Sequence, residues 1–246
     1  MLTALLLAVI TAVLLVLTFA TARRPAEPMP GRAEYLRRWA PLHGGHEPRP
    51  DSIVGRWLSV AYTAARPLAA RGMAPDLLTA WGVLVSAAVA AIAGAGGRWP
   101  LAAVAVVVAA GLLDNLDGAV AILAGRTSRW GFVLDSLADR LSDAAYVFAL
   151  WLLGAPGAVC VAAGGLMGLQ EYARARAGNA GMGDVGVITV WERPSRVILT
   201  AFLLLGSGLL PHSADAIVTA GAAAWVVLGT VGLTQLLVVV HRRLAD

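Results

Sequence analysis

Long apolar runs separated by short polar connections dominate the chain. The first run, residues 2–20, contains no charged side chain and matches the ~20 residues that a helix needs to span a bilayer. The pattern predicts an all-α fold: a polytopic membrane helical bundle with six core transmembrane helices and one N-terminal transmembrane helix. The core helices are expected at residues 77–94, 100–123, 131–153, 157–173, 197–210 and 214–240.

Residues 54–70 have an amphipathic pattern instead. Their apolar side chains recur at helical spacing, whereas Arg56 and Arg66 fall outside that stripe. This spacing predicts an amphipathic helix that lies on the membrane surface. A linker helix packed on the protein core is the alternative interpretation.

The first apolar run also resembles a secretory signal peptide, because a small-residue cleavage pattern follows it at residues 20–22. A signal peptide carries positive charge before its apolar run, however, whereas Arg23 and Arg24 come after this one. We therefore expect a retained transmembrane helix at residues 1–22, a cytoplasmic linker at 23–52 and a membrane domain at 53–246. The linker is rich in proline, glycine and charge, which predicts poor order.

The composition excludes a soluble enzyme. Hydrophobic residues make up 59% of the chain and charged residues 14%, against roughly 45–50% and about 25% in soluble domains. The single cysteine, Cys160, excludes an intrachain disulfide and a cysteine-rich zinc site.

The basic residues, all of them arginines, are distributed by connection. Along the successive connections and the C-terminal tail, their numbers are 9, 1, 2, 0, 4, 0 and 2. This alternation predicts that the arginine-rich segments are cytoplasmic and that the N-terminus is outside, as in a multi-pass protein of the cell membrane. The same distribution makes nucleic acid an unexpected partner, although the net charge is +4.

Four aspartates lie inside apolar runs. A charged side chain at bilayer depth costs on the order of 2.5–3.5 kcal/mol, so these acids need compensation. Asp114 and Asp117 are three residues apart and Asp135 and Asp139 are four apart, so each pair shares a helix face. The two helices are joined by a short turn, which places Asp117 and Asp135 each about 10 Å from it. All four carboxylates are therefore expected to converge near the cytoplasmic face.

Four like charges in one pocket repel each other unless protons or divalent cations neutralise them. Carboxylate oxygens without histidine or cysteine favour Mg²⁺, Mn²⁺ or Ca²⁺. Small residues border the acids at Gly118, Ala121 and Gly131. They would let a bulky anionic ligand approach the backbone closely, and close helix packing in the membrane is the alternative explanation.

These residues together resemble the signature of the CDP-alcohol phosphatidyltransferases, D-x2-D-G-x2-A-R-x8-G-x3-D-x3-D. The chain follows it with correct spacing from Asp114 to Asp139 and departs at one fixed position, where Ile122 stands in place of arginine. Arg126, one helical turn further on, is the candidate to take that role. The resemblance covers roughly residues 54–240.

The resemblance implies transfer of a phosphatidyl group from CDP-diacylglycerol to an alcohol, with release of CMP. It implies that two Mg²⁺ or Mn²⁺ ions are held by Asp114, Asp117 and Asp135. The fourth acid, Asp139, would be the general base and a further metal ligand. It also implies that Gly118, Ala121 and Gly131 border the CDP moiety, and that the protein forms a homodimer in the lipid bilayer.

A second group of residues bears on the acceptor. The fourth cytoplasmic segment contains Arg174, Arg176, Arg193 and Arg196, and arginine suits bidentate recognition of phosphate. This group resembles the basic pocket of family members whose acceptor is itself phosphorylated, such as inositol phosphate or glycerol phosphate. The excess of arginine in cytoplasmic segments is the alternative explanation.

Two other functions stay open at this level. Intramembrane acids are also typical of cation transporters, although a conduction path would need polar groups in the outer half of the membrane too. Because Ile122 replaces the signature arginine, a catalytically silent homologue is the second alternative.

Overall fold

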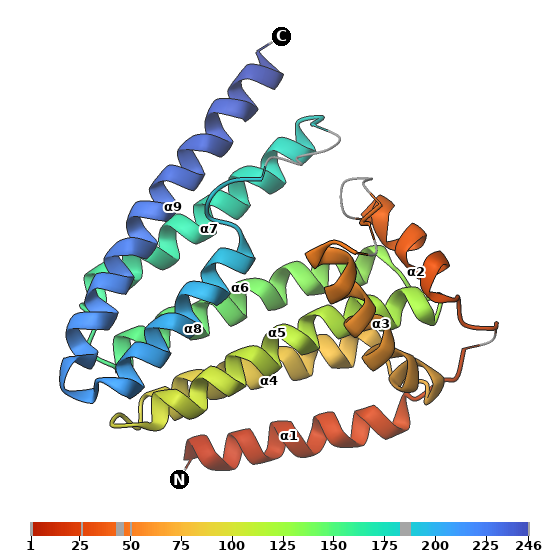
Figure 1. Ribbon diagram of the computed structural model, residues 1–246, viewed down its shortest axis with the longest axis horizontal. Coiled ribbons are helices and arrows are strands. Elements are labelled where there is room, and N and C mark those ends of the chain that lie inside the picture. Colours follow the sequence, from red (N-terminus) through yellow and green to blue (C-terminus); the bar gives the residue numbers. More distant parts are fainter. Residues whose placement is uncertain (1, 26, 43–46, 50, 183–187, 246) are drawn as a thin grey trace. The chain divides into compact units, whose positions relative to one another are not determined.

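The computed structural model describes residues 2–25, 27–42, 47–49, 51–182 and 188–245. All regular structure within these ranges is helical, which confirms the predicted all-α class (Figure 1). The α-helices are α1 (Leu2–Ala20), α2 (Arg32–Trp39), α3 (Ile53–Ala70), α4 (Pro75–Ala93), α5 (Trp99–Leu123), α6 (Arg129–Leu152), α7 (Gly157–Asn179), α8 (Arg193–Leu209) and α9 (Ala214–Leu244). Two short 3-10 helices, η1 (Ala40–Leu42) and η2 (Pro211–Ser213), precede α3 and α9.

Every predicted apolar run contains a helix. Among the described residues, three helical segments are long and apolar enough to cross a membrane on their own composition: α4, α5 and Pro211–Leu244. Two of the others fall short for visible reasons, since α8 has only 17 residues and α6 carries several charged side chains. The sidedness of the helices and the division into three segments stay predictions.

By its internal contacts the chain divides into two units, Met1–Leu84 with Ala109–Ala138, and Val85–Val108 with Asp139–Asp246. In the first unit, α3 turns a stripe of small and apolar side chains toward a buried cluster that includes Leu58, Ala61 and Ala65. The hydroxyl of Ser52 caps this helix by accepting a 3.0 Å hydrogen bond from the Gly55 amide. Helix α3 is therefore amphipathic as predicted, and its buried stripe packs on protein.

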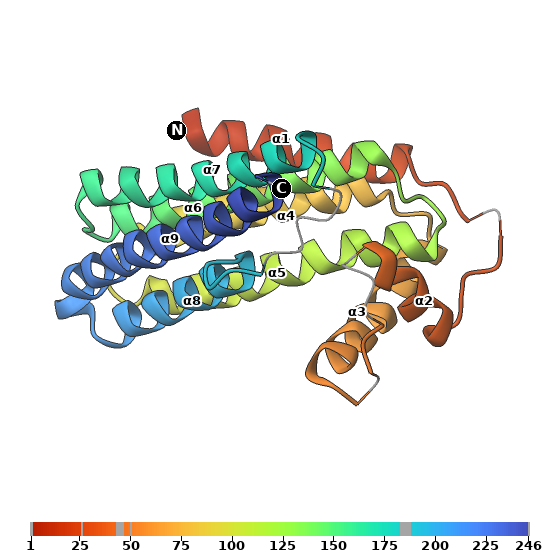
Figure 2. The ribbon, with the colours of Figure 1, turned by 90° about the horizontal axis from the view of Figure 1, so that it is seen from above.

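Helix α2 corrects the expectation of poor order in the linker. It packs against α3, as both ribbon views show (Figures 1 and 2), and buries Tyr35 and Leu36 in the same apolar cluster. The sequence pattern missed it because eight residues supply only two buried apolar positions among three arginines. Residues 26, 43–46 and 50 of the predicted linker lie outside the described residues.

A glycine ties the N-terminal segment to the rest of the first unit. Gly72 has a φ of +83°, and a Cβ atom there would lie 2.5 Å from the backbone carbonyl carbon of Arg23. The Arg23 amide in turn donates a 2.9 Å hydrogen bond to the Gly72 carbonyl. Only glycine permits both the left-handed conformation and this approach.

We expect Gly72→Ala to lower the free energy of unfolding by about 3 kcal/mol, from the left-handed backbone and the clash together. The matched control is Gly96→Ala, because Gly96 has a φ of +70° with open space around it. This control should lose only about 1 kcal/mol. Chemical denaturation in detergent measures both values, and equal losses would contradict the importance of the Arg23 contact.

In the second unit, α7 and α8 each pack against α9. Glycines of α9 permit close packing, since a Cβ at Gly229 would lie 3.2 Å from the Cβ of Leu166 in α7. A Cβ at Gly232 would lie 2.8 Å from the Cβ of Trp191, which precedes α8. Trp191 and Trp225 are fully buried and meet edge to face, with ring centroids 5.0 Å apart. This tight packing fixes the position of the first turn of α8, which carries Arg193 and Arg196.

Candidate functional site

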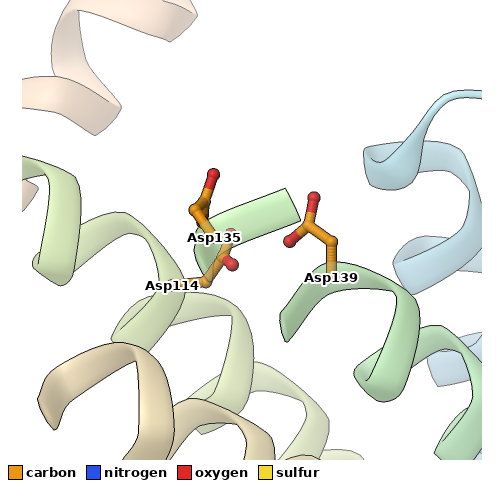
Figure 3. Close-up of side chains that lie close together, drawn as sticks. All are labelled: Asp114, Asp135 and Asp139. Carbon is orange, nitrogen blue, oxygen red and sulfur yellow. The ribbon is translucent and has the colours of Figure 1, made fainter. Parts of the chain in front are cut away.

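Three of the four predicted aspartates form one group. Oxygen atoms of Asp114, Asp135 and Asp139 all lie within 4.8 Å of one another (Figure 3). Asp135 and Asp139 lie one turn apart in the unbroken helix α6, which fixes their carboxylates relative to one another. Asp114 comes from α5, whose C-terminal half precedes the short turn into α6.

The fourth aspartate, Asp117, points elsewhere. Its side chain is buried and accepts a 2.5 Å hydrogen bond from the Thr79 hydroxyl of α4. Its other oxygen accepts a 2.6 Å hydrogen bond from the Gly118 amide. The structure thus places Asp117 next to the group, on the same face of α5 as Asp114, with α4 orienting it.

The three grouped carboxylates fit a divalent metal ion by their chemistry. Carboxylate oxygens are the ligands that Mg²⁺ and Mn²⁺ prefer, and these come from two helices that hold them close together. Like charges this close are stabilised by a cation. The donor set therefore fits the ions that the sequence predicts.

The small residues predicted to border a nucleotide lie beside these acids. Gly118 is exposed, and a Cβ added to it would meet no atom within 4 Å. At the start of α6, the Gly131 amide donates a 2.9 Å hydrogen bond to the Ser128 hydroxyl. Open space beside Gly118 leaves room for a ligand at the α5 backbone.

Two arginines contact Asp139, the predicted base. Arg193, in the first turn of α8, forms an ion pair with Oδ1 of Asp139. Arg140, the next residue in α6, lies 3.4 Å from Oδ2. Each oxygen of this carboxylate therefore faces a guanidinium group.

Arg140 and two more acids extend this arrangement into a network across α6, α7 and α8. Arg140 lies 2.5 Å from Oε1 of Glu171 and 3.6 Å from Oδ2 of Asp143. Arg196 pairs with the same oxygen of Asp143 and lies 3.1 Å from Oε1 of Glu171. The side chains of Asp143 and Arg196 are 0% and 1% exposed, so this pair is fully buried.

The four arginines proposed for the acceptor phosphate therefore have different surroundings. Arg176 is exposed, at the cytoplasmic end of α7 by the predicted topology. Arg174 and Arg193 are partly buried and lie next to acids, with Nη2 of Arg174 2.8 Å from Oε1 of Glu192. Arg196 alone is completely enclosed.

Arg140 and Asp143 are functional-site residues that were not predicted from the sequence. Both lie inside the apolar run predicted at residues 131–153, and a charged side chain within a membrane helix is by default a sign of function or pairing. Their spacing of three residues also predicts an ion pair on one helix face. Their charges within an apolar run are therefore the sequence signal that marks them.

Ile122, the departure from the signature, lies in the apolar cluster of the first unit and is 4% exposed. Arg126, the candidate to replace the missing arginine, donates a hydrogen bond from Nη2 to the carbonyl oxygen of Arg23. Arg126 is therefore hydrogen-bonded to the N-terminal segment, and the side chain of Ile122 packs in the apolar core.

Comparison with known proteins identifies the family. A sequence model of the CDP-alcohol phosphatidyltransferase family matches residues 72–236. The chain is 32% identical over 201 residues to an archaetidylinositol phosphate synthase of Methanothermobacter thermautotrophicus, covering 79% of this chain and 97% of that protein. It is 34% identical over 146 residues to a phosphatidylinositol phosphate synthase of Streptomyces avermitilis, covering 54% of this chain but only 58% of that protein.

Solved structures of the phosphatidylinositol phosphate synthase of Mycobacterium tuberculosis are also similar. The complex with manganese and citrate has a TM-score of 0.60 at 28% identity, covering 73% of this chain and 88% of that one. The structure with CDP-DAG bound has a TM-score of 0.57 at 28% identity, covering 72% and 94%. Both comparisons leave about a quarter of this chain unmatched.

Proposed function

Because the chain belongs to the CDP-alcohol phosphatidyltransferase family, we propose that it transfers a phosphatidyl group from CDP-diacylglycerol to a phosphorylated alcohol and releases CMP. The observation that carries the proposal is the group of Asp114, Asp135 and Asp139, which combines metal-ligating chemistry with the family signature. The similar mycobacterial enzyme has been crystallised both with CDP-DAG and with manganese.

Bound Mg²⁺ or Mn²⁺ would hold the diphosphate oxygens and stabilise the charge that builds on the leaving CMP. Asp114 and Asp135 would hold the metal, and buried Asp117, oriented by Thr79, would support them. Gly118 leaves the space through which the CDP moiety would approach α5.

Asp139 would serve as the base. It would take the proton from the acceptor hydroxyl as that oxygen attacks the phosphorus attached to diacylglycerol. The new P–O bond forms as the bond to the bridging oxygen breaks, and that oxygen leaves with CMP. The guanidiniums of Arg140 and Arg193 contact the two oxygens of Asp139 and so hold this carboxylate in one orientation.

We propose inositol phosphate as the acceptor, ahead of glycerol phosphate. Several relatives are inositol phosphate lipid synthases, including the bacterial and archaeal proteins above. Arg174, Arg176 and Arg193 are the accessible basic side chains that would bind the acceptor phosphate beside Asp139.

The proposed acceptor is tested by measuring CMP release from CDP-diacylglycerol by the purified chain with Mn²⁺ or Mg²⁺. We expect turnover with inositol phosphate to exceed that with unphosphorylated inositol by at least about 100-fold, because charge-assisted hydrogen bonds to phosphate are lost with inositol. Faster turnover with glycerol phosphate than with inositol phosphate would identify glycerol phosphate as the acceptor instead. Binding of CDP-diacylglycerol without turnover with any acceptor would identify a silent homologue and overturn the proposal.

A further inference from the structure

We propose that the buried Asp143–Arg196 pair, acting through Arg140, positions the carboxylate of Asp139. In this role Arg196 is a positioning residue for the base, and the acceptor phosphate binds to the other arginines. The inference rests on the proposed function and names further residues that its chemistry needs.

Burial is the first reason. Asp143 is 0% and Arg196 1% exposed, and removing two charges from water costs several kcal/mol for each ion. Well-packed hydrophobic residues of similar volume are often as stabilising as such a pair, or more so. Stability alone therefore explains the pair poorly, and a geometric role beside the reacting groups explains it better.

Connectivity is the second reason. Arg140 lies near three carboxylates, at 3.4 Å from Asp139, 3.6 Å from Asp143 and 2.5 Å from Glu171. Arg196 holds two of these three, Asp143 and Glu171. Fixing those two acids fixes the guanidinium of Arg140, and that guanidinium contacts Oδ2 of the base.

The position of Arg196 on α8 is the third reason. Arg193 lies three residues before it, so both side chains belong to one face of the helix. When Arg196 anchors α8 to α6 and α7, Arg193 is brought to Oδ1 of Asp139. The same anchor thus sets the contacts of both oxygens of the base.

Charge balance argues against phosphate binding by Arg196. The network joins four carboxylates (Asp139, Asp143, Glu171 and Glu192) to four guanidiniums (Arg140, Arg174, Arg193 and Arg196). An acceptor phosphate could reach Arg196 only by displacing acids from a guanidinium that is 1% exposed. Arg176 is exposed, and the side chains of Arg174 and Arg193 are 23% and 15% exposed, so a phosphate can reach these three more easily than Arg196.

The test compares Arg196→Lys and Asp143→Asn with the wild-type chain in steady-state assays that vary each substrate. Lysine keeps the charge but cannot bridge two carboxylates as the planar guanidinium does. We expect each variant to lower kcat by roughly 10- to 100-fold, because small misplacements of a catalytic group have effects of this size. KM for CDP-diacylglycerol and for the acceptor should change less than twofold.

If Arg196→Lys fails to fold, Asp143→Asn still tests the proposal. A carboxylate does not bind phosphate, so a fall in kcat in this variant cannot come from a lost phosphate ligand. The control is Arg242→Gln, an exposed arginine at the end of α9, which should keep wild-type kcat. Thermal unfolding in detergent is measured for every variant, and the positioning role requires kcat to fall while the folded fraction at assay temperature is unchanged.

Three results would overturn the inference. A rise in acceptor KM with unchanged kcat in Arg196→Lys would make Arg196 a phosphate ligand. Loss of kcat only in proportion to lost folded protein would make the pair purely structural. Unchanged kinetics in both variants would show that the Asp143–Arg196 pair has no role in catalysis. A wild-type chain that releases no CMP would refute the proposed function itself, which distinguishes that failure from the other three.

Discussion

Replacing Asp135 with asparagine is expected to lower CMP release from CDP-diacylglycerol by about 1000-fold. The carboxylate of Asp135 lies close to those of Asp114 and Asp139. Asparagine keeps the shape of the side chain but removes the negative charge that holds a divalent ion. Metal ions supply several kcal/mol of transition-state stabilisation, and a loss of ~4 kcal/mol corresponds to this factor. Steady-state rates at saturating Mn²⁺ measure the effect.

The control for Asp135→Asn is Asp215→Asn, the same chemical change at an exposed aspartate in the first turn of α9. This variant should keep wild-type turnover. Membrane insertion and the unfolding midpoint of Asp135→Asn should also be unchanged or improved, because removing a like charge from the group relieves repulsion. Turnover within threefold of wild type would show that this carboxylate holds no essential metal.

Asp139→Asn is the second substitution with a large expected effect. The amide cannot accept the proton of the acceptor hydroxyl, and general base catalysis contributes 10²–10⁴-fold, so we expect kcat to fall by about 1000-fold. KM for CDP-diacylglycerol should change little, because Asp114 and Asp135 remain in place. The measurement is a kinetic series in each substrate.

A different pattern in Asp139→Asn would contradict the assignment of the base. If kcat were retained and only the affinity for Mn²⁺ fell, Asp139 would be a metal ligand without a role in proton transfer. The isosteric control is Asn115→Asp, which adds an acid to α5 beside Asp114 without touching Asp139. It should leave the proton-transfer step intact, so its kcat should exceed that of Asp139→Asn by at least about tenfold.

The helices and the acidic group were predictable because simple periodicities encode them. Apolar runs of bilayer length gave the long helices, and acids three or four residues apart gave shared faces on α5 and α6. The convergence of Asp114, Asp135 and Asp139 followed from the short turn between those helices. These are local features, which a single sequence displays directly.

The remaining features depend on long-range contacts that periodicity does not show. Asp117 turns to Thr79 in α4, 38 positions earlier in the chain. Arg196 reaches acids on two other helices, so its burial was invisible from a segment that reads as a basic connection. Helix α2 escaped prediction because only its packing against α3 explains its two buried residues.

Manganese binding by the purified chain shows whether Asp114 and Asp135 hold a divalent metal ion. Electron paramagnetic resonance of free Mn²⁺, titrated with detergent-solubilised protein, reports binding without any substrate. We expect wild type and Asp215→Asn to bind equally, and Asp114→Asn and Asp135→Asn to lose at least about tenfold in affinity. Equal Mn²⁺ binding by all four proteins would contradict the claim that these aspartates form the metal site.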